Sequence, residues 1–202
     1  GCDCGRFLEL WNLVFTQFNQ NADGTYTPLK HKNIDTGAGL ERLASVIQGK
    51  PSNFETDLIF PIIELACELS HKKYNADAKT DISLKVVADH ARSLTFMIGD
   101  GILPSNEGRG YVLRRILRRA VRHGRMLGIT GKFLEGAVDA VVNIYKGAAD
   151  FEELVNKQDY IKKVISLEED RFAATLAQGM ELLNGHIAEL KAAGKQELAG
   201  EI

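Results

Sequence analysis

The stretch Tyr111–Arg125, YVLRRILRRAVRHGR, sets the character of this chain. Its apolar residues recur every three or four positions, which is the spacing of one helix face: Val112, Leu113, Ile116, Leu117, Ala120 and Val121. The opposite face carries only arginine: Arg114, Arg115, Arg118, Arg119 and Arg122. We call these five residues the arginine face. The pattern predicts an amphipathic helix that packs its apolar side on a core.

An arginine face without acidic residues needs an explanation, because no Asp or Glu lies between Gly108 and Leu134. Like charges at helical spacing cost about 0.2–0.5 kcal/mol per pair. Guanidinium groups match phosphate in a bidentate manner, which favours a nucleic-acid partner. The alternative is neutralisation within the chain, for which Glu168, Glu169 and Asp170 are candidates. The two interpretations can share residues.

The bulk composition is that of an ordinary globular protein. The 202 residues have a net charge of -2 and are 45% hydrophobic, which excludes collagen-like and disordered classes. No apolar run is long enough to span a membrane. The near-neutral sum hides the local excess of arginine. The chain starts without Met and without a secretory leader, so we expect a fragment of a longer protein.

Three cysteines form an odd set without a disulfide framework, which indicates a reducing, cytoplasmic location. Cys2 and Cys4 could be half of a metal site or two ordinary thiols. The histidines are scattered, so no metal cluster is predicted in this chain. His90, which follows Asp89, is expected to be a structural histidine with satisfied ring nitrogens rather than a base.

The N-terminal part predicts β structure. Residues 7–18, FLELWNLVFTQF, are rich in aromatic and β-branched residues and are typical of a buried strand. A turn signal at 21–24 ends in Asp-Gly, and residues 25–35 are expected to return antiparallel. A helix is expected to follow over LERLASVIQ, ending near Gly49 and Pro51.

The remainder predicts helices at 54–71, 84–98, 111–127, 132–145 and 150–190, with a loop over 101–110. No proline follows Pro104, so nothing in the sequence interrupts the last helix. The fold class is therefore α+β and mostly α: a β-hairpin and one helix in residues 1–53, then a helical domain in residues 54–202.

Two further constellations can carry chemistry. Asp35, Gly37, Gly39 and Arg42 share one strand-to-helix turn, where a carboxylate and an arginine suit a ligand with a cationic and an anionic end. A pair of glycine caps with a surface salt bridge explains the same residues. In the loop before the arginine face, the amide of Asn106 suits a base edge, or Ser105 or Asn106 simply caps the helix.

Three stretches together resemble the alanyl-tRNA synthetase family of class II aminoacyl-tRNA synthetases, in the right order. They are LELWNLVFTQFN (8–19), IDTGAGLERLASV (34–46) and VVADHARSLTFMIGDGILPSNEGRGYVLRRILRRAVRHGRMLG (86–128). The GAGLER element is similar to motif 3 of the class, and PSNEGRGYVLRR is typical of the alanine-specific enzymes. The resemblance covers essentially the whole chain and weakens after about residue 130.

For residues 1–53 the resemblance implies the C-terminal part of an antiparallel-sheet catalytic domain. It implies that Asp35 binds the α-amino group of alanine and that Asn12, Val14 and Gly37 line the small amino-acid pocket. Arg42 is then the catalytic motif 3 arginine that holds ATP phosphate, with Gly39 beside it at the ATP site.

For residues 54–202 the resemblance implies the tRNA-recognition domain, in which Asn106 reads a G·U wobble pair of the tRNA(Ala) acceptor stem. The cationic contacts are expected from Arg109, Arg114, Arg115, Arg118, Arg119 and Arg122. The expected partners of the parent enzyme are alanine, ATP with Mg²⁺ and tRNA(Ala), and a membrane is not among them. Its zinc site and motifs 1 and 2 lie outside these residues, so we expect the chain alone to be inactive and to hold no cofactor. The alternative is a helical RNA-binding or scaffold module without catalysis.

Overall fold

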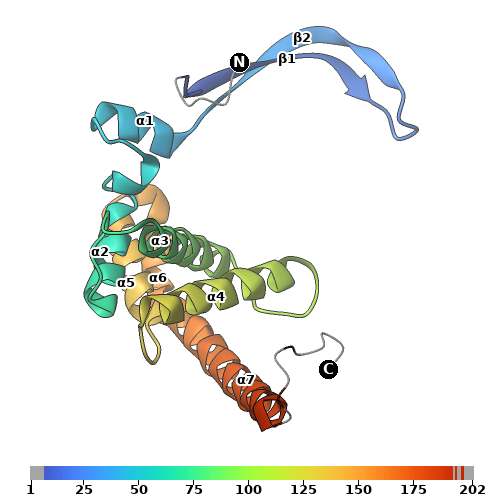
Figure 1. Cartoon of the computed structure of the whole chain (residues 1–202). Coiled ribbons are helices and arrows are strands. Elements are labelled where there is room, and N and C mark those ends of the chain that lie inside the picture. Colours follow the sequence, from blue (N-terminus) through green and yellow to red (C-terminus); the bar gives the residue numbers. More distant parts are fainter. Residues whose placement is uncertain (1–6, 193, 195–196, 198–202) are drawn as a thin grey trace. The chain divides into compact units, whose positions relative to one another are not determined.

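A computed structural model describes residues 7–192, 194 and 197 (Figure 1). The chain forms two compact units, residues 1–59 and residues 60–202, and each is described by itself. Cys2 and Cys4 lie outside the described residues. Within the described part, Cys67 is a free thiol.

The first unit is built on a long β-hairpin, which confirms the two antiparallel strands. Strand β1 (Trp11–Gln20) pairs with β2 (Tyr26–Ala38). Gly24 closes the turn with φ of 86°, a left-handed conformation that glycine adopts without strain. The prediction that β1 is buried is wrong: Trp11 and Phe15 are 65% and 64% exposed. The described residues of this unit form a sheet of two strands, which is too small to enclose its own side chains.

Helix α1 (Leu40–Ile47) follows β2, as predicted. Gly49, with φ of 62°, ends this segment. A short 3₁₀ turn, η1 (Asn53–Glu55), is capped by the Ser52 hydroxyl, which accepts from the backbone N–H of Phe54 at 3.2 Å. The Gln48 side chain ties α1 to the segment after η1, because its Nε2 donates to Asp57 Oδ1 at 2.6 Å.

The second unit is a helical bundle (Figure 1). Its elements are α2 (Phe60–Ser70), α3 (Ala78–Gly99), α4 (Gly108–Leu127), α5 (Leu134–Tyr145), η2 (Ala149–Phe151), α6 (Glu152–Asn156) and α7 (Gln158–Ala192). Helix α3 is central and packs on α2, α4, α5 and α7. The fold class, α+β and mostly α, is confirmed.

The core of the bundle consists of aliphatic side chains with at most 1% exposure. The largest of them are Ile62, Ile63, Leu84, Val87, Leu94, Ile98, Leu113, Leu117, Leu134, Ile161 and Ile165. Burying each such side chain contributes about 1.5–3 kcal/mol. Leu113 and Leu117 belong to the predicted apolar face of the arginine helix, whereas Val112 on that face is 49% exposed. The apolar side of α4 therefore faces the core over a narrower stripe than predicted.

Helix α4 begins at Gly108, inside the predicted loop, and α5 begins at Leu134, two residues later than predicted. Three other helix boundaries differ more from the predictions. Helix α2 begins at Phe60, because η1 takes up residues 53–55. Helix α3 begins earlier, at Ala78, where the Asp77 carboxylate accepts two backbone N–H groups. The predicted helix 150–190 is interrupted at Lys157, between α6 and α7. The Lys157 ammonium donates to the carbonyl of Gly99 at 2.8 Å and so fixes the break against the end of α3. Among the described residues no helix has the length and hydropathy required to cross a bilayer.

Candidate active site and nucleic-acid interface

The strand register places four predicted site residues on one face of the hairpin. Asn12 pairs with Gly37, and Val14 pairs with Asp35. Directly opposed residues share a face, and residues two apart on one strand share it as well. Asn12, Val14, Gly37 and Asp35 therefore form a contiguous patch, which we call the hairpin site.

The other face of the same strands is apolar. It carries Trp11, Leu13, Phe15 and Ile34, each of which is between 57% and 65% exposed. The Trp11 indole N–H donates to the hydroxyl of Thr36 on this face. The alternation thus separates the polar hairpin site from an aromatic surface.

The hairpin site is narrow at Gly37. A Cβ atom built there would lie 3.3 Å from Asn12 Oδ1, so a larger residue would press on the asparagine. Asp35 Oδ1 accepts the backbone N–H of Thr36 at 2.8 Å, which orients the carboxylate. An exposed carboxylate held in this way can accept hydrogen bonds from an ammonium group.

Arg42 connects α1 to the segment that precedes β1. Its Nη1 donates to the carbonyl of Glu9 at 2.7 Å, and its aliphatic stem covers Gly39. Gly39 is the N-cap residue of α1, as the glycine-cap interpretation predicts, and its N–H donates to Leu10 O at 3.2 Å. Arg42, however, is bonded to a backbone carbonyl rather than to a carboxylate. Its guanidinium is exposed near the positive end of α1, where an anion is favoured.

In the helical unit, the arginine face of α4 divides into two rows. Arg114 and Arg118 point toward α7, where Glu168 Oε1 lies 3.0 Å from Arg114 Nε and 3.3 Å from Arg118 Nη2. The Glu168 side chain is only 2% exposed. The Arg118 guanidinium also lies 5.2 Å from the ring centre of Phe172, one turn further along α7. Neutralisation of part of the arginine face within the chain, by Glu168, is therefore confirmed.

The second row faces α3 and solvent. Arg119 Nη1 lies 2.7 Å from His90 Nε2, and His90 Nδ1 lies 2.9 Å from Asp89 Oδ2. Both ring nitrogens of His90 are satisfied, as expected for a structural histidine. The Arg115 guanidinium lies 5.7 Å from the ring centre of Tyr111, a cation–π contact.

The remaining two predicted contact residues are less engaged. Arg109 and Arg122 are exposed, and within residues 7–192 neither side chain has a hydrogen bond or an ion pair. Their charges are thus available to a ligand.

The loop before α4 does not cap this helix through its side chains. The N-cap residue is Glu107, whose side chain makes no capping bond, and the Ser105 hydroxyl donates to Glu107 O at 2.7 Å. The cap interpretation of Ser105 and Asn106 is therefore wrong. The Asn106 Oδ1 instead accepts from Arg114 Nη1. The loop lies tightly against α4, because a Cβ on Gly110 would be 2.2 Å from Leu103 O.

The other two acidic candidates serve other partners. Glu169 is 3% exposed and accepts the backbone N–H of Phe133 at 3.3 Å, at the start of α5. Burial raises the pKa of the Glu169 carboxyl to about 7. Asp170 pairs with Lys132 at 3.1 Å. A buried carboxylate at the N-terminus of another helix has no signature in the sequence, and only the run of three acids gave a hint of it.

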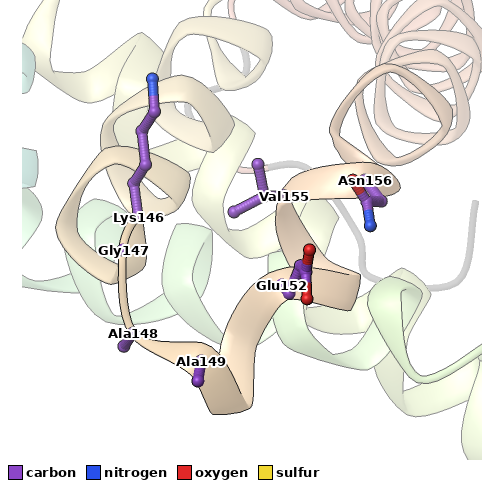
Figure 2. Close-up of a pocket in the computed structure, with 7 residues that line it drawn as sticks. All are labelled: Lys146, Gly147, Ala148, Ala149, Glu152, Val155 and Asn156. Atoms are coloured by element: carbon purple, nitrogen blue, oxygen red, sulfur yellow. The ribbon is translucent and has the colours of Figure 1, made fainter.

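A separate pocket of about 430 Å³ lies between the end of α5 and α6 (Figure 2). It is lined by residues 146–149 together with Glu152, Val155 and Asn156. None of the predicted site residues borders it. Among the described residues, no group of three or more His, Cys, Asp or Glu side chains is arranged to hold a metal ion.

Comparison with known proteins decides the family. The model of a family described as tRNA synthetases class II (A) matches residues 2–202. The chain belongs to the class II (A) tRNA synthetases. Among its relatives, the alanine–tRNA ligase of Natranaerobius thermophilus is 54% identical over 99% of this chain. Those of Pediococcus pentosaceus and Alkaliphilus metalliredigens are 57% and 56% identical, over 96% and 98% of the chain.

The resemblance to the alanyl-tRNA synthetases is thereby confirmed. The chain spans 22–23% of the length of these relatives. This synthetase chain therefore corresponds to a stretch of each relative, and the roles of its individual residues stay predictions.

Proposed function

We propose that the chain supplies part of the alanine and ATP site, and the acceptor-stem recognition surface, of an alanine–tRNA ligase. This activity joins alanine, with ATP, to the 3′ end of tRNA(Ala). The observation that carries the proposal is the register of the hairpin, which gathers Asn12, Val14, Asp35 and Gly37 on one face. Alanine and tRNA are proposed as substrates because the relatives are named alanine–tRNA ligases.

The hairpin site has the chemistry that alanine requires. The Asp35 carboxylate is available for the α-ammonium group, and Val14, its cross-strand neighbour, offers an apolar wall for a methyl group. Gly37 and Asn12 approach each other closely enough to limit the size of the side chain that fits. Fixed placement of the amino acid is what an adenylation reaction needs, because positioning supplies much of its rate.

The nucleotide is assigned to Arg42 and Gly39. Arg42 uses one N–H on Glu9 O and presents an exposed guanidinium beside the N-terminus of α1, a setting that fits a phosphate group. Its action is to hold phosphate charge while the alanine carboxylate attacks the α-phosphorus of ATP and pyrophosphate leaves. No Mg²⁺ ligands are assigned to the described residues, and the metal would accompany ATP. We expect the zinc site of the whole enzyme to lie outside these 202 residues. We also expect the enzyme to act in the cytoplasm.

The acceptor stem is assigned to α4 and the loop before it. One buried carboxylate, Glu168, faces Arg114 and Arg118, with Arg171 at 3.9 Å, so the cluster keeps a net positive charge. Arg109 and Arg122 add exposed charge. Such a surface supports phosphate contacts, and Asn106 beside it supports reading of a base pair.

RNA binding tests this assignment. We expect the 202-residue chain to bind an acceptor-stem RNA hairpin, measured by fluorescence anisotropy, with a logarithmic salt slope of about 0.7–0.9 per phosphate contacted. The double variant Arg109→Glu/Arg122→Glu should weaken binding at least about tenfold and reduce that slope. The matched control Lys72→Glu/Lys79→Glu changes the net charge equally outside α4 and should bind nearly as the parent chain does.

A scaffold without a nucleic-acid role is the second candidate, favoured by the Glu168 ion pairs. It requires that the chain show no RNA binding, or that both double variants lose affinity equally. We further expect no alanine-dependent ATP–pyrophosphate exchange by the chain alone, because motifs 1 and 2 are not among its residues. Measurable exchange would contradict that expectation.

A further inference from the structure

The Asn106 side chain is restrained, because it belongs to a series of contacts that ends inside the bundle. Its Oδ1 accepts from Arg114 Nη1. Arg114 Nε in turn lies 3.0 Å from Oε1 of Glu168. The three side chains come from the loop before α4, from α4 and from α7, and they are arranged in the order Asn106, Arg114, Glu168.

The inner end of this series of contacts, at Glu168, is rigid. Glu168 is 1% exposed as a residue, and Arg114 keeps only 20% of its side-chain exposure. Arg118 contacts the same Oε1 from one turn further along α4, and it also lies over Phe172. Glu168 is thus held by two arginines, and Arg114 cannot swing away without leaving a buried carboxylate short of a partner, which is costly.

The outer end determines what Asn106 can recognise. An asparagine amide has one acceptor oxygen and an NH₂ donor group, and a free side chain can present either. The bond from Arg114 uses one of the two lone pairs of Oδ1 and holds that oxygen toward α4, so the Nδ2 donors lie on the opposite side of the amide. A fixed amide discriminates between base edges better than a rotating one, because a wrong edge meets a donor that cannot turn away.

We propose that Glu168 is a positioning residue for RNA discrimination, which acts through Arg114 to hold the amide of Asn106 in one orientation. The inference rests on the proposed acceptor-stem function and extends it to α7, a helix that supplies no residue to the predicted RNA contacts. Glu168 itself contacts no ligand. Its effect is on selectivity between RNAs rather than on the strength of phosphate binding.

The variant Glu168→Gln separates selectivity from affinity. It keeps the size of the side chain and removes one buried negative charge, so electrostatics alone would raise the affinity for every RNA equally. The probes are two acceptor-stem hairpins that differ only in a G·U or a G·C pair at the recognised position. We expect the dissociation constant of the G·C hairpin divided by that of the G·U hairpin to fall about three- to tenfold, which corresponds to the loss of one hydrogen bond. The affinity for the G·C hairpin should not fall.

Two further variants complete the test. Asn106→Ala should lower the ratio by a similar factor, and Glu168→Gln should add little in its presence, because both act on one contact. Arg171→Gln alters the residue 3.9 Å from the other oxygen of Glu168, and it should leave the ratio unchanged. If Glu168→Gln does not fold, Arg114→Lys replaces it, since a lysine keeps the charge but cannot bridge Glu168 and Asn106.

A measurement without RNA keeps this inference separate from the proposed function. The side-chain NH₂ resonances of Asn106, assigned by ¹⁵N NMR, should shift in Glu168→Gln and stay in place in Arg171→Gln. Unchanged resonances, or an unchanged ratio where Asn106→Ala abolishes selectivity, would overturn the positioning role. Absence of RNA binding, or full selectivity in Asn106→Ala, would instead refute the proposed function.

Discussion

Glu169 makes the stability of the helical unit depend on pH in a direction opposite to that of most carboxylates. Its pKa rises from 4.5 to about 7, because burial penalises the charged form more than the Phe133 N–H stabilises it. The folded state therefore holds the proton more tightly than the unfolded state. The contribution of Glu169 to the free energy of unfolding is fully present below pH 4.5 and is lost as pH rises through 7.

The magnitude follows from the two pKa values. Each factor of ten in proton affinity is worth about 1.4 kcal/mol, so the full contribution is about 3 kcal/mol. Between pH 5 and pH 8 the chain loses about 2.5 kcal/mol of this stabilisation. The variant Glu169→Gln has no charge to bury and lacks this loss. Its absolute stability also reflects the buried Oε2 position, which has no hydrogen-bond partner, so the pH dependence is the diagnostic quantity.

Urea unfolding followed by circular dichroism at pH 5 and pH 8 measures the effect. The helical signal comes mainly from the second unit, which contains all helices after α1, whereas Trp11, the single tryptophan, lies in the first unit. We expect the difference in unfolding free energy between Glu169→Gln and the parent chain to change by about 2.5 kcal/mol over this range. The control Glu181→Gln removes an exposed carboxylate from the same helix and should follow the parent. A change below about 1 kcal/mol would refute the reasoning.

Three further changes probe local structure. Gly110→Ala places a Cβ at 2.2 Å from Leu103 O, so we expect selectivity between the two RNA hairpins to fall, with a melting temperature lowered by several degrees in calorimetry. Asp77→Ala removes the cap of α3 and should cost about 1 kcal/mol in urea unfolding. Arg122→Gln removes an exposed charge and should reduce the logarithmic salt slope of RNA binding by just under one, with unfolding unchanged.

The sequence predicts the elements well where the signal is local. The Asp-Gly turn and the flanking β-rich runs predict the hairpin, and the apolar spacing at Leu113 and Leu117 predicts the buried side of α4. Burial of β1 is mispredicted because aromatic density does not reveal whether another layer packs on a strand. The break at Lys157 is missed because the contact that holds it, a hydrogen bond from Lys157 to Gly99, joins residues far apart in the chain.

In the candidate site, too, the residues are predictable from local sequence, whereas their arrangement depends on contacts between distant residues. The four residues of the hairpin site could be named from the resemblance, but their common face depends on the register. Glu168, Glu169 and Asp170 were proposed together as partners of the arginine face, and only Glu168 takes that role. Successive residues on a helix point about 100° apart, so three adjacent acids reach α4, the start of α5 and Lys132 respectively.

The irregularity in the hairpin has a consequence for how its length can vary in evolution. Between the pairs Thr16–Asn33 and Phe18–Pro28, one residue of β1 stands opposite four of β2, residues 29–32. A one-residue slip in a regular ladder moves every side chain to the opposite face. Here the unpaired residues 29–32 separate the two paired segments, so an insertion or deletion near the turn need not change the register of the segment that contains Asn12 and Asp35. The tip of the hairpin is therefore free to change length, while Asn12 and Asp35 keep their partners.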